Sequence, residues 1–146
     1  MTVRPVKLSD HEEWLSLRMA LWPECPADQQ LAEMLSYGDF GGSQIAFVAG
    51  VGRLSGFNEA SLRQTAAGCA TSPVGNIEGI FVKPDYRRRG VGRALVAAAE
   101  EWAASRGCTE MASDCLFDNS ASELFHRKLG YCVTERLIHF RRSLVR

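Results

Sequence analysis

The sequence predicts an α/β (α+β) fold in which helices cover the faces of a mixed sheet. Two amphipathic helical patterns come first, three short extended stretches follow, and helical and extended patterns then alternate. The chain has 146 residues, which suits one domain, and it shows neither an internal repeat nor a linker. We therefore expect a single domain over residues 1–146.

Two helices are expected near the beginning of the sequence. Ser9 and Glu12 have the spacing of a capping box, and the apolar residues after them recur at helical spacing as far as Trp22. Pro23 should end this helix, since proline lacks the N–H that the next turn needs. A second helix is expected over Pro26–Gly38. The inward-facing residues should be Trp14, Leu17, Arg18, Leu21 and Trp22 in the first helix, and Leu31, Met34 and Leu35 in the second.

Extended segments follow in the middle of the chain. Gln44–Ala49 and Leu54–Arg63 predict an antiparallel hairpin, because a glycine-containing turn over residues 50–53 separates them. Residues 64–73 are small and polar and should form a loop. Val74–Val82 is apolar on both faces, which is typical of a central, covered strand.

The strand over residues 74–82 contains a glycine at position 79, which indicates a bulge or the close approach of another group. Simple alternation directs Ile77 and Phe81 to one face, and Ile80 and Val82 to the other.

Helical and extended patterns alternate in the last third. Arg93–Arg106 predicts a helix that ends at Gly107, and Cys108–Asp114 predicts a strand. Ser120–Leu129 predicts another helix, with Ser120 and Glu123 as a second capping box. Tyr131–Arg142 alternates in part and predicts one or two strands. The buried face of the helix over 93–106 should carry Leu95, Ala98, Ala99 and Trp102.

Composition and charge argue against several classes of function. Seventeen basic residues balance seventeen acidic ones, so no overall field attracts nucleic acid or an anionic membrane. No apolar run approaches the ~20 residues that span a bilayer, and no signal-peptide pattern is present. The five cysteines lack C-x-x-C spacing and there are only three histidines, so no metal site is expected. Reduced thiols in a cytoplasmic protein are the simplest interpretation.

A basic, glycine-rich turn over residues 82–93 joins the central strand to the next helix. Gly90 and Gly92 let the backbone approach a ligand, and the first N–H groups of the helix have no acceptor within it. Together with the helix dipole and five arginine or lysine side chains, these groups predict a pyrophosphate site. A P-loop would need G-x-x-x-x-G-K-[ST] and a Rossmann fingerprint a third glycine, and neither is present. The alternative is a solvated basic turn.

At this point the sequence resembles a known family. Arg87-x-x-Gly90-x-Gly92 is similar to the acetyl-CoA pyrophosphate loop of the GCN5-related N-acetyltransferases, and Asn119 followed by a helix that ends in 127–131 resembles their second motif. Further stretches resemble one branch, the aminoglycoside 6'-N-acetyltransferases. These stretches are Leu21-Trp22-Pro23, Ser72-Pro73, Glu78-Gly79-Ile80-Phe81-Val82, Glu110-Met111-Ala112-Ser113-Asp114 and Thr134-Glu135-Arg136.

The resemblance implies a mostly antiparallel sheet in which two parallel strands, 74–82 and 108–114, splay apart around the thioester of acetyl-CoA. Backbone groups of Ile80, Phe81 and Val82 would pair with the pantetheine arm. A backbone N–H near Phe81 or Val82 would stabilise the oxyanion. The diphosphate would be held, mainly by backbone N–H groups, at Arg88, Arg89, Gly90, Val91, Gly92 and Arg93.

The resemblance also assigns Asn119 to the pantetheine amide. The alternative for Asn119 is a simple Asx-turn before a helix, and the alternative for residues 80–82 is ordinary strand pairing.

The acceptor amine must lose a proton, so the site needs a carboxylate. Glu78 is expected to anchor the substrate and to act as a base through water, and Asp114 to be a second anchor. The alternative for both is a surface or edge carboxylate that pairs with an arginine. Trp22 would form a flat wall against a sugar ring or ammonium, or else be a core aromatic. Cys25 stands near the expected substrate mouth.

Glu135 would extend the acidic surface, and the resemblance implies that it comes from the partner subunit of a homodimer, because relatives pair through this tail. The alternative is a solvated strand residue. His126 stands where many relatives have a tyrosine that acts as an acid, although a structural histidine is the preferred interpretation. Ala66 and Ala67 stand where this branch has aromatic substrate contacts.

The expected function is direct transfer of acetyl from acetyl-CoA to the 6'-amine of an aminoglycoside, with no metal. One alternative is acetylation of another amine, such as a polyamine, an amino sugar or a peptide N-terminus. Another is a non-catalytic regulator that binds acyl-CoA.

Overall fold

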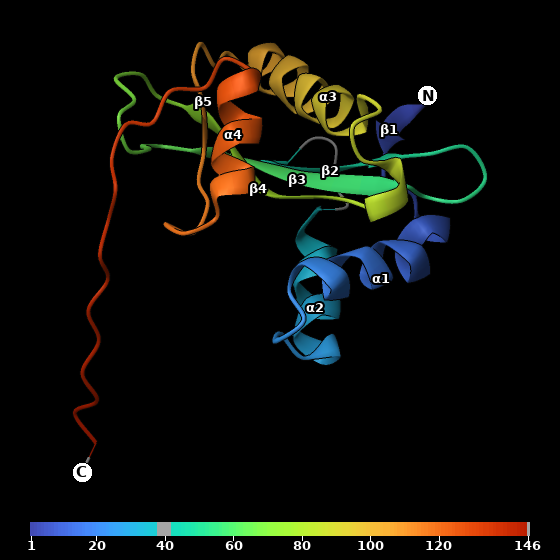
Figure 1. Cartoon of the computed structure of the whole chain (residues 1–146), viewed down its shortest axis with the longest axis horizontal. Helices are drawn as coiled ribbons and strands as arrows, with labels where there is room; N and C mark the ends of the chain where they lie inside the picture. The colour runs from blue at the N-terminus through green and yellow to red at the C-terminus, as the bar shows by residue number, and fades with distance from the viewer. Residues whose placement is uncertain (38–41, 146) are drawn as a thin grey trace. The chain divides into compact units, whose positions relative to one another are not determined.

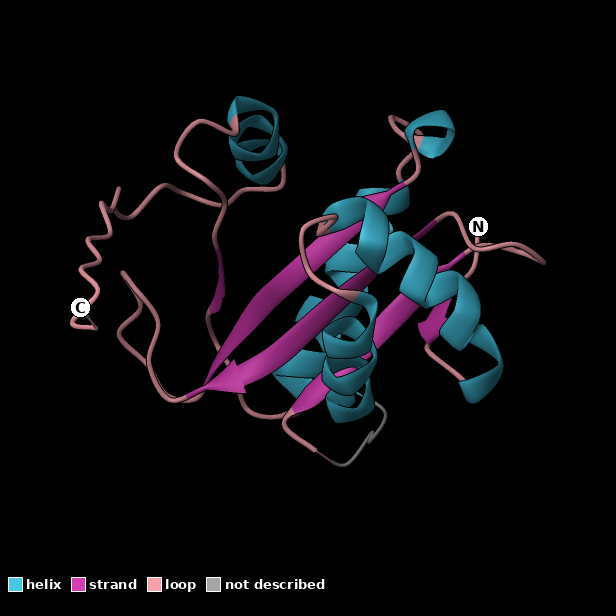
Figure 2. Cartoon of the chain, turned by 90° about the horizontal axis from the view of Figure 1, so that it is seen from below, coloured by secondary structure: helices cyan, strands magenta, loops and turns pink. Residues whose placement is uncertain are grey.

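One sheet of five strands organises the part of the chain that is described, residues 1–37 and 42–145 of a computed structural model. Neighbouring strands are antiparallel from β1 to β4, and β5 lies parallel to β4 at the edge (Figures 1 and 2). This mixed, mostly antiparallel sheet confirms the expected fold class. The strands are β1 (Val3–Pro5), β2 (Gln44–Ala49), β3 (Gly56–Arg63), β4 (Val74–Val82) and β5 (Met111–Ser113).

Helices cover both faces of this sheet (Figure 1). Helix α3 (Val91–Ser105) lies on one face, and α1 (His11–Leu21) and α2 (Ala27–Met34) lie on the other. Short 3₁₀ turns stand at Leu8–Asp10, Leu35–Tyr37 and Pro84–Tyr86. None of the described helices is long and apolar enough to cross a membrane.

Two hydrophobic clusters fill the layers between sheet and helices. Under α3, Leu95, Ala99 and Trp102 pack against Ile45 and Phe47 of β2 and neighbouring residues. On the opposite face, Trp14, Leu17 and Met34 pack against Val48 of β2 and Phe57 of β3. These contacts confirm the predicted inner faces of α1 and α3, although Leu21, Trp22 and Ala98 are only partly buried.

The chain divides into two compact units, the first covering Met1–Ser113 and the second beginning at Asp114. The sheet and α1 to α3 belong to the first unit, and α4 (Ser120–Lys128) belongs to the second.

A bulge interrupts the pairing of β3 with β4. Glu59 faces Gly79 and Ala60 faces Ile77, so Glu78 is the extra residue. The bulge confirms the expectation from Gly79, but it breaks the simple alternation along the strand. Because Ile77 pairs with Ala60 of the α3 cluster and Phe81 packs on the α1 cluster, Ile77 and Phe81 face opposite ways. Their predicted common face is therefore wrong.

Several element boundaries differ from the predictions. Strand β1 was not expected, β3 begins at Gly56, and β5 is limited to Met111–Ser113. Helix α2 ends at Met34, and the predicted helix end at Gly38 lies outside the described residues. Gln30 and Met34 are its buried residues, whereas Leu31 and Leu35 are exposed, because the Gln30 side chain is used to bond the end of α1.

The predicted capping boxes also take other forms. Before α1, the Asp10 carboxylate accepts the Lys7 N–H at 2.7 Å and pairs with Arg4, in place of the predicted Ser9 and Glu12. Before α4, Asn119 is the N-cap and its Oδ1 accepts the Ser122 N–H at 3.1 Å. Hydrogen bonds from Arg4 and Lys7 lower the pKa of Asp10, although its partial burial works in the opposite direction.

The segment over residues 131–145 contains no strand, so the strands predicted over Tyr131–Arg142 are not formed. A strand needs a neighbouring strand to satisfy its backbone groups, and the second unit contains none. The apolar side chains of Leu137, Ile138, Phe140, Leu144 and Val145 are exposed.

Candidate active site

Glu78 is held at the bulge of β4 by three side chains from the same face of the sheet. Its Oε2 accepts hydrogen bonds from Ser61 Oγ, from Asn76 Nδ2 at 2.7 Å and from Arg63 Nε at 3.0 Å. Its Oε1 accepts Arg63 Nη2 at 2.6 Å. Partial burial raises the pKa of Glu78, but the hydrogen bonds from Arg63, Ser61 and Asn76 outweigh it, so the pKa is lowered overall. Glu78 is therefore a charged acceptor at neutral pH.

Trp22 lies directly over the residue that follows Glu78. A Cβ atom at Gly79 would stand 2.5 Å from Trp22 Cη2, so the glycine is what lets the indole approach the strand. Trp22 also packs edge-on against Phe57, with ring centroids 6.2 Å apart. The half-buried indole is thus compatible with both predicted roles. One side of the ring packs on the core, and the other borders Glu78.

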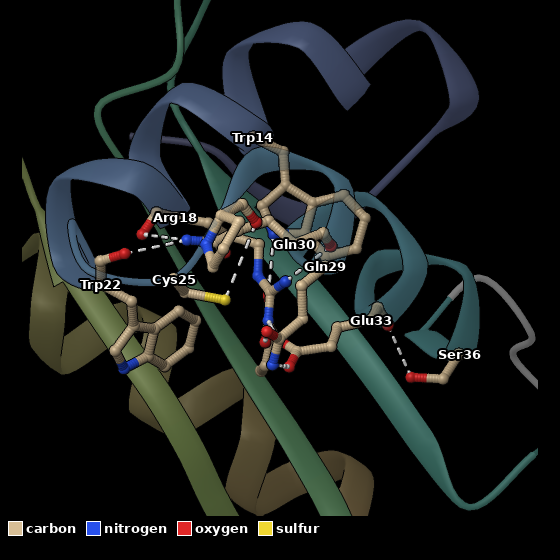
Figure 3. A network of polar contacts seen from close by, with 10 residues as sticks. Trp14, Arg18, Trp22, Cys25, Gln29, Gln30, Glu33 and Ser36 are labelled. Carbon is tan, nitrogen blue, oxygen red and sulfur yellow. Dashed lines mark hydrogen bonds and ion pairs between the residues drawn. The ribbon is translucent and has the colours of Figure 1, made fainter.

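Cys25 belongs to the turn that follows α1. Its N–H donates to the Trp22 carbonyl at 3.1 Å, and its thiol lies 3.9 Å from the Pro26 carbonyl (Figure 3). The turn places Cys25 beside Trp22, and its position near a substrate mouth stays a prediction.

A buried ion pair, which the sequence did not predict, lies behind Trp22. Arg18 Nε stands 2.9 Å from Glu59 Oε2, and Trp14 Nε1 donates to the same oxygen at 3.0 Å. The Arg18 guanidinium also lies over the Trp22 ring, 4.8 Å from its centroid. Burial raises the pKa of Glu59, and the charge of Arg18 opposes this effect.

The same guanidinium ties α1 to α2. Arg18 Nη1 donates to the Gln30 carbonyl and Nη2 to Glu33 Oε2, both at 3.0 Å (Figure 3). Gln30 Nε2 returns a hydrogen bond to the Trp22 carbonyl at 3.0 Å. The only signal for this network in the sequence is an arginine on the apolar face of the first helix.

The edge of β4 beyond the bulge is open within the first unit. Pairing with β5 ends at Ile77 and Ser113, and β4 continues to Val82. Among the described residues, no strand pairs with this edge of β4 along Ile80, Phe81 and Val82, as the addition of an extended chain would require. Arg87 Nε donates to the Val82 carbonyl at 2.8 Å and joins the strand to the following loop.

The basic loop after β4 has the backbone geometry of an anion site. Arg88 and Gly90 both have left-handed backbone conformations, with φ of 63° and 83°. Gly90 is the N-cap of α3 and has no side-chain cap, so the N–H groups of Val91, Gly92 and Arg93 have no acceptor within the helix. The Val91 side chain is buried and fixes the loop, whereas Arg88, Arg89 and Arg93 are exposed. Such a concave set of N–H groups at a helix N-terminus suits a diphosphate.

The loop over residues 64–73 is fastened to the residue before β5. Glu110 Oε1 accepts the N–H groups of Ala70 and Thr71 at 2.9 and 2.8 Å, together with the Thr71 hydroxyl. The hydrogen bonds from Thr71 and Ala70 lower the pKa of Glu110. This carboxylate therefore holds the loop that carries Ala66 and Ala67, a role that the sequence alone did not suggest.

The remaining predicted site residues belong to the second unit. Asp114 begins it as an exposed residue directly after β5, and Glu135 is exposed in the tail. Asn119 forms the N-cap of α4, which is the geometry of its alternative role. The Nδ1 atom of His126 lies 2.7 Å from the Ser122 carbonyl, consistent with the structural role preferred for it. The first unit contains the other predicted residues: Trp22, Cys25 and Glu78, the backbone of 80–82 and the loop of 88–93.

Among the described residues, no group of three or more His, Cys, Asp or Glu side chains is arranged to hold a metal ion.

Comparisons with known proteins identify the class. The acetyltransferase (GNAT) family matches residues 9–131. Aminoglycoside N(6')-acetyltransferase type 1 of Klebsiella aerogenes is 44% identical over 147 residues, which cover 97% of this chain and 96% of that protein. The protein of the same name from Salmonella enteritidis is 42% identical over 145 residues, with coverage of 97% and 99%. The chain therefore belongs to the acetyltransferase (GNAT) family.

Solved structures show which members of the family this chain resembles. The structure of AAC(6')-Iy in complex with the bisubstrate analogue CoA-S-monomethyl-acetylneamine has a TM-score of 0.89 and 38% identity, and covers 97% of both chains. The aminoglycoside 6'-N-acetyltransferase AAC(6')-Ih from Acinetobacter baumannii has a TM-score of 0.88 and 34% identity, and covers 98% of both chains. Within the family, this chain is thus similar to the aminoglycoside 6'-N-acetyltransferases.

Proposed function

We propose that this chain transfers the acetyl group of acetyl-CoA directly to the 6'-amine of an aminoglycoside. The relatives at 44% and 42% identity have this activity in their names. The observation that carries the proposal is the Glu78 carboxylate. It lies at the bulge of β4 beside Trp22 and next to the open strand edge, and its low pKa keeps it negative where a cationic substrate would enter.

The first unit offers a fitting site for acetyl-CoA, which supplies the activated acetyl group. The N–H groups at the beginning of α3, with Arg88 and Gly90 in left-handed conformations, suit the diphosphate. Ile80, Phe81 and Val82 offer backbone groups along the open edge of β4 to the amide-containing arm. From the resemblance, we also assign Asn119 to an amide of that arm.

The acceptor amine must be neutral when it attacks, although an alkylammonium has a pKa near ~10. Glu78, directly or through a water molecule, accepts the proton that the amine loses as the N–C bond forms. A backbone N–H of Phe81 or Val82 stabilises the negative charge that develops on the carbonyl oxygen. The C–S bond breaks and CoA leaves as a thiolate, a good leaving group that needs no acid from the protein.

The substrate side would combine negative charge with an aromatic surface. Trp22 provides the wall next to Glu78, and Cys25 borders it. Asp114 and Glu135 would supply further carboxylates for the other ammonium groups of the drug. All of these groups suit a polycation, whose binding should weaken as salt rises.

The tail over residues 131–145 supports a homodimer. Its exposed apolar residues, among them Leu137, Ile138 and Phe140, need a covering surface, and its backbone needs a strand partner that the second unit does not supply. A second copy of this chain would provide both and would bring Glu135 to the site of its partner. The five free cysteines fit a reducing compartment, so we place the enzyme in the cytoplasm.

A thiol-release assay tests the proposed reaction. Acetyl-CoA is mixed with the protein and with kanamycin-type drugs, their 6'-hydroxyl analogues, spermidine or short peptides. We expect release with drugs that carry a 6'-amine and none with the hydroxyl analogues. Release only with other amines would contradict the substrate, and CoA binding without any release would favour a non-catalytic regulator.

The acetyl-CoA site is tested separately with Gly90→Val, which places a branched side chain at a φ of 83° in the anion loop. Gly107→Val at the other end of α3 is the matched control, since its φ is 88° and a Cβ there would meet no atom within 4 Å, while one at Gly90 would only touch Met1 at 3.9 Å. Calorimetry should show CoA binding weakened in Gly90→Val and retained in Gly107→Val. Equal CoA affinity in both variants would contradict the diphosphate assignment.

A further inference from the structure

Glu78 already holds a cation that belongs to the protein. Arg63 grips the carboxylate with two hydrogen bonds, from Nη2 to Oε1 at 2.6 Å and from Nε to Oε2 at 3.0 Å. A fork of this kind has the charge and the donors that a substrate ammonium would bring to the same oxygens. If Glu78 binds the substrate, Arg63 and the substrate ammonium would compete for the same carboxylate oxygens.

The other partners of Glu78 would keep the carboxylate in position without Arg63. Ser61 and Asn76 both donate to Oε2, whereas Oε1 accepts its hydrogen bond from Arg63 alone among the described residues. Removal of the guanidinium would therefore expose Oε1 to an incoming ammonium and leave the carboxylate oriented through Oε2. The site can exchange one cation for another without being rebuilt.

Arg63 stands where such an exchange is easiest. It is the last residue of β3, directly before the loop over 64–73, and 46% of its side chain is exposed, against 22% for Glu78. The Glu110 carboxylate accepts hydrogen bonds from Ala70 and Thr71 and so fastens the far end of the loop. The half-exposed guanidinium of Arg63 can leave Glu78 while that end of the loop stays fixed.

We propose that Arg63 is an internal competitor of the substrate: its guanidinium occupies the ammonium site on Glu78 and leaves when the acceptor binds. The proposal rests on the proposed function, because it takes the acceptor to be an amine that Glu78 anchors. Apparent affinity then equals intrinsic affinity multiplied by the fraction of molecules in which Arg63 has left Glu78. Arg63 sets the affinity of the site for every amine that uses Glu78.

The test measures binding of kanamycin to the full-length, CoA-loaded protein by calorimetry. Arg63→Gln should lower Kd by about twofold to fivefold, the range expected when one partly exposed ion pair no longer competes. The same factor is expected for a monoamine, because the competition does not depend on the number of ligand charges. Arg63→Lys, which keeps a cation without the fork, should give an intermediate Kd.

Arg53→Gln is the matched control. Arg53 is exposed in the turn before β3, at the end opposite Arg63, and its loss changes the net charge equally. Its Kd should stay at the wild-type value. A gain in Arg53→Gln, or a gain in Arg63→Gln that grows with ligand charge, would indicate a general charge effect and overturn the proposal.

A second measurement follows the competitor itself. In the wild type, the NMR signal of the Arg63 Nε–H, which donates to Glu78, should shift and exchange faster with water when kanamycin is added. An unchanged signal with bound drug, or equal or weaker binding by Arg63→Gln, would overturn the competition while thiol release still supports the function. Absence of both release and binding in wild type and Arg63→Gln would overturn both.

Discussion

Two arginine–glutamate pairs lie on the same face of the sheet and differ in burial. In the pair of Arg18 and Glu59, 3% and 1% of the side chains are exposed. In the pair of Arg63 and Glu78, the values are 46% and 22%. Each pair includes a residue of β3, Glu59 in the first and Arg63 in the second. The N···O distances of the two ion pairs are 2.9 and 2.6 Å, so solvent exposure distinguishes the pairs more than distance does.

The difference in solvent exposure gives the two ion pairs different roles: the buried pair stabilises the fold, and the exposed pair is available to a ligand. A buried charge cannot change partner without a large desolvation cost, so Arg18 and Glu59 stay paired and hold α1 against the sheet. A partly exposed pair contributes little stability and can exchange its cation. Trp22 links the two, because its ring contacts Arg18 on the α1 side and stands over Gly79 beside Glu78.

The largest effect is expected from Arg18→Met. The substitution leaves the Glu59 carboxylate buried without its cation, which should destabilise the fold by about 3–5 kcal/mol. The matched variant Arg63→Met removes the exposed pair and should cost at most about 1 kcal/mol. Urea denaturation measures both. Similar losses in the two variants would contradict the distinction between the pairs.

A smaller effect is expected from Gly79→Ala. The new Cβ would meet Trp22 ring atoms at 2.5 and 2.6 Å, so the indole must move, at a cost of about 1–3 kcal/mol. Because Trp22 borders the Glu78 site, KM for the amine should also rise. Gly52→Ala is the control, with an open but left-handed position in the turn before β3, and it should leave KM unchanged. An unaltered KM in Gly79→Ala would contradict the proposal that Trp22 contacts the substrate.

The pH dependence of stability should report the exposed pair. The folded-state pKa of Glu78 is lowered, so its contribution is present above the unfolded value of ~4.3 and is lost as pH falls through the folded pKa. Arg63→Gln removes one cause of the lowering. The stability difference between wild type and Arg63→Gln should therefore be at most ~1 kcal/mol near pH 7 and disappear below pH ~4. A difference that grew on acidification would contradict this sign.

The smallest effect is local and concerns the loop beside the exposed pair. Glu110→Ala removes the acceptor of the Ala70 and Thr71 N–H groups. Hydrogen exchange of these two amides should accelerate, while amides of the central strands keep their protection. Glu101→Ala, an exposed change on α3, serves as the control. Unchanged exchange in Glu110→Ala would show that the carboxylate does not hold the loop.

Much of the fold could be predicted from local patterns. Helical spacing located α1 and α3, and the apolar strand and its glycine located β4 and the bulge. The pattern failed where a polar side chain was buried: Gln30 replaced Leu31 on the inner face of α2 because its amide bonds the end of α1. It failed again at Ile77, because one extra residue reverses the alternation.

The sequence singled out candidate reactive groups but not the side chains that bind them. Glu78 and the loop over 88–93 stand out in sequence because charge and glycine are unusual at those places. Arg63 and Glu110 do not, since a charged residue at the end of a predicted strand or inside a short one is common. Their roles depend on contacts across 15 and 40 residues of sequence, which only the fold brings together.

The central claim is that Glu78 serves the reaction and not the fold, and Glu78→Gln tests it most directly. Thiol release with a 6'-amine drug, CoA calorimetry and thermal unfolding are measured on the same preparation. We expect kcat/KM to fall by about 10²-fold or more, the range of a lost general base, with CoA affinity and Tm close to wild type. An unchanged kcat/KM would contradict the account.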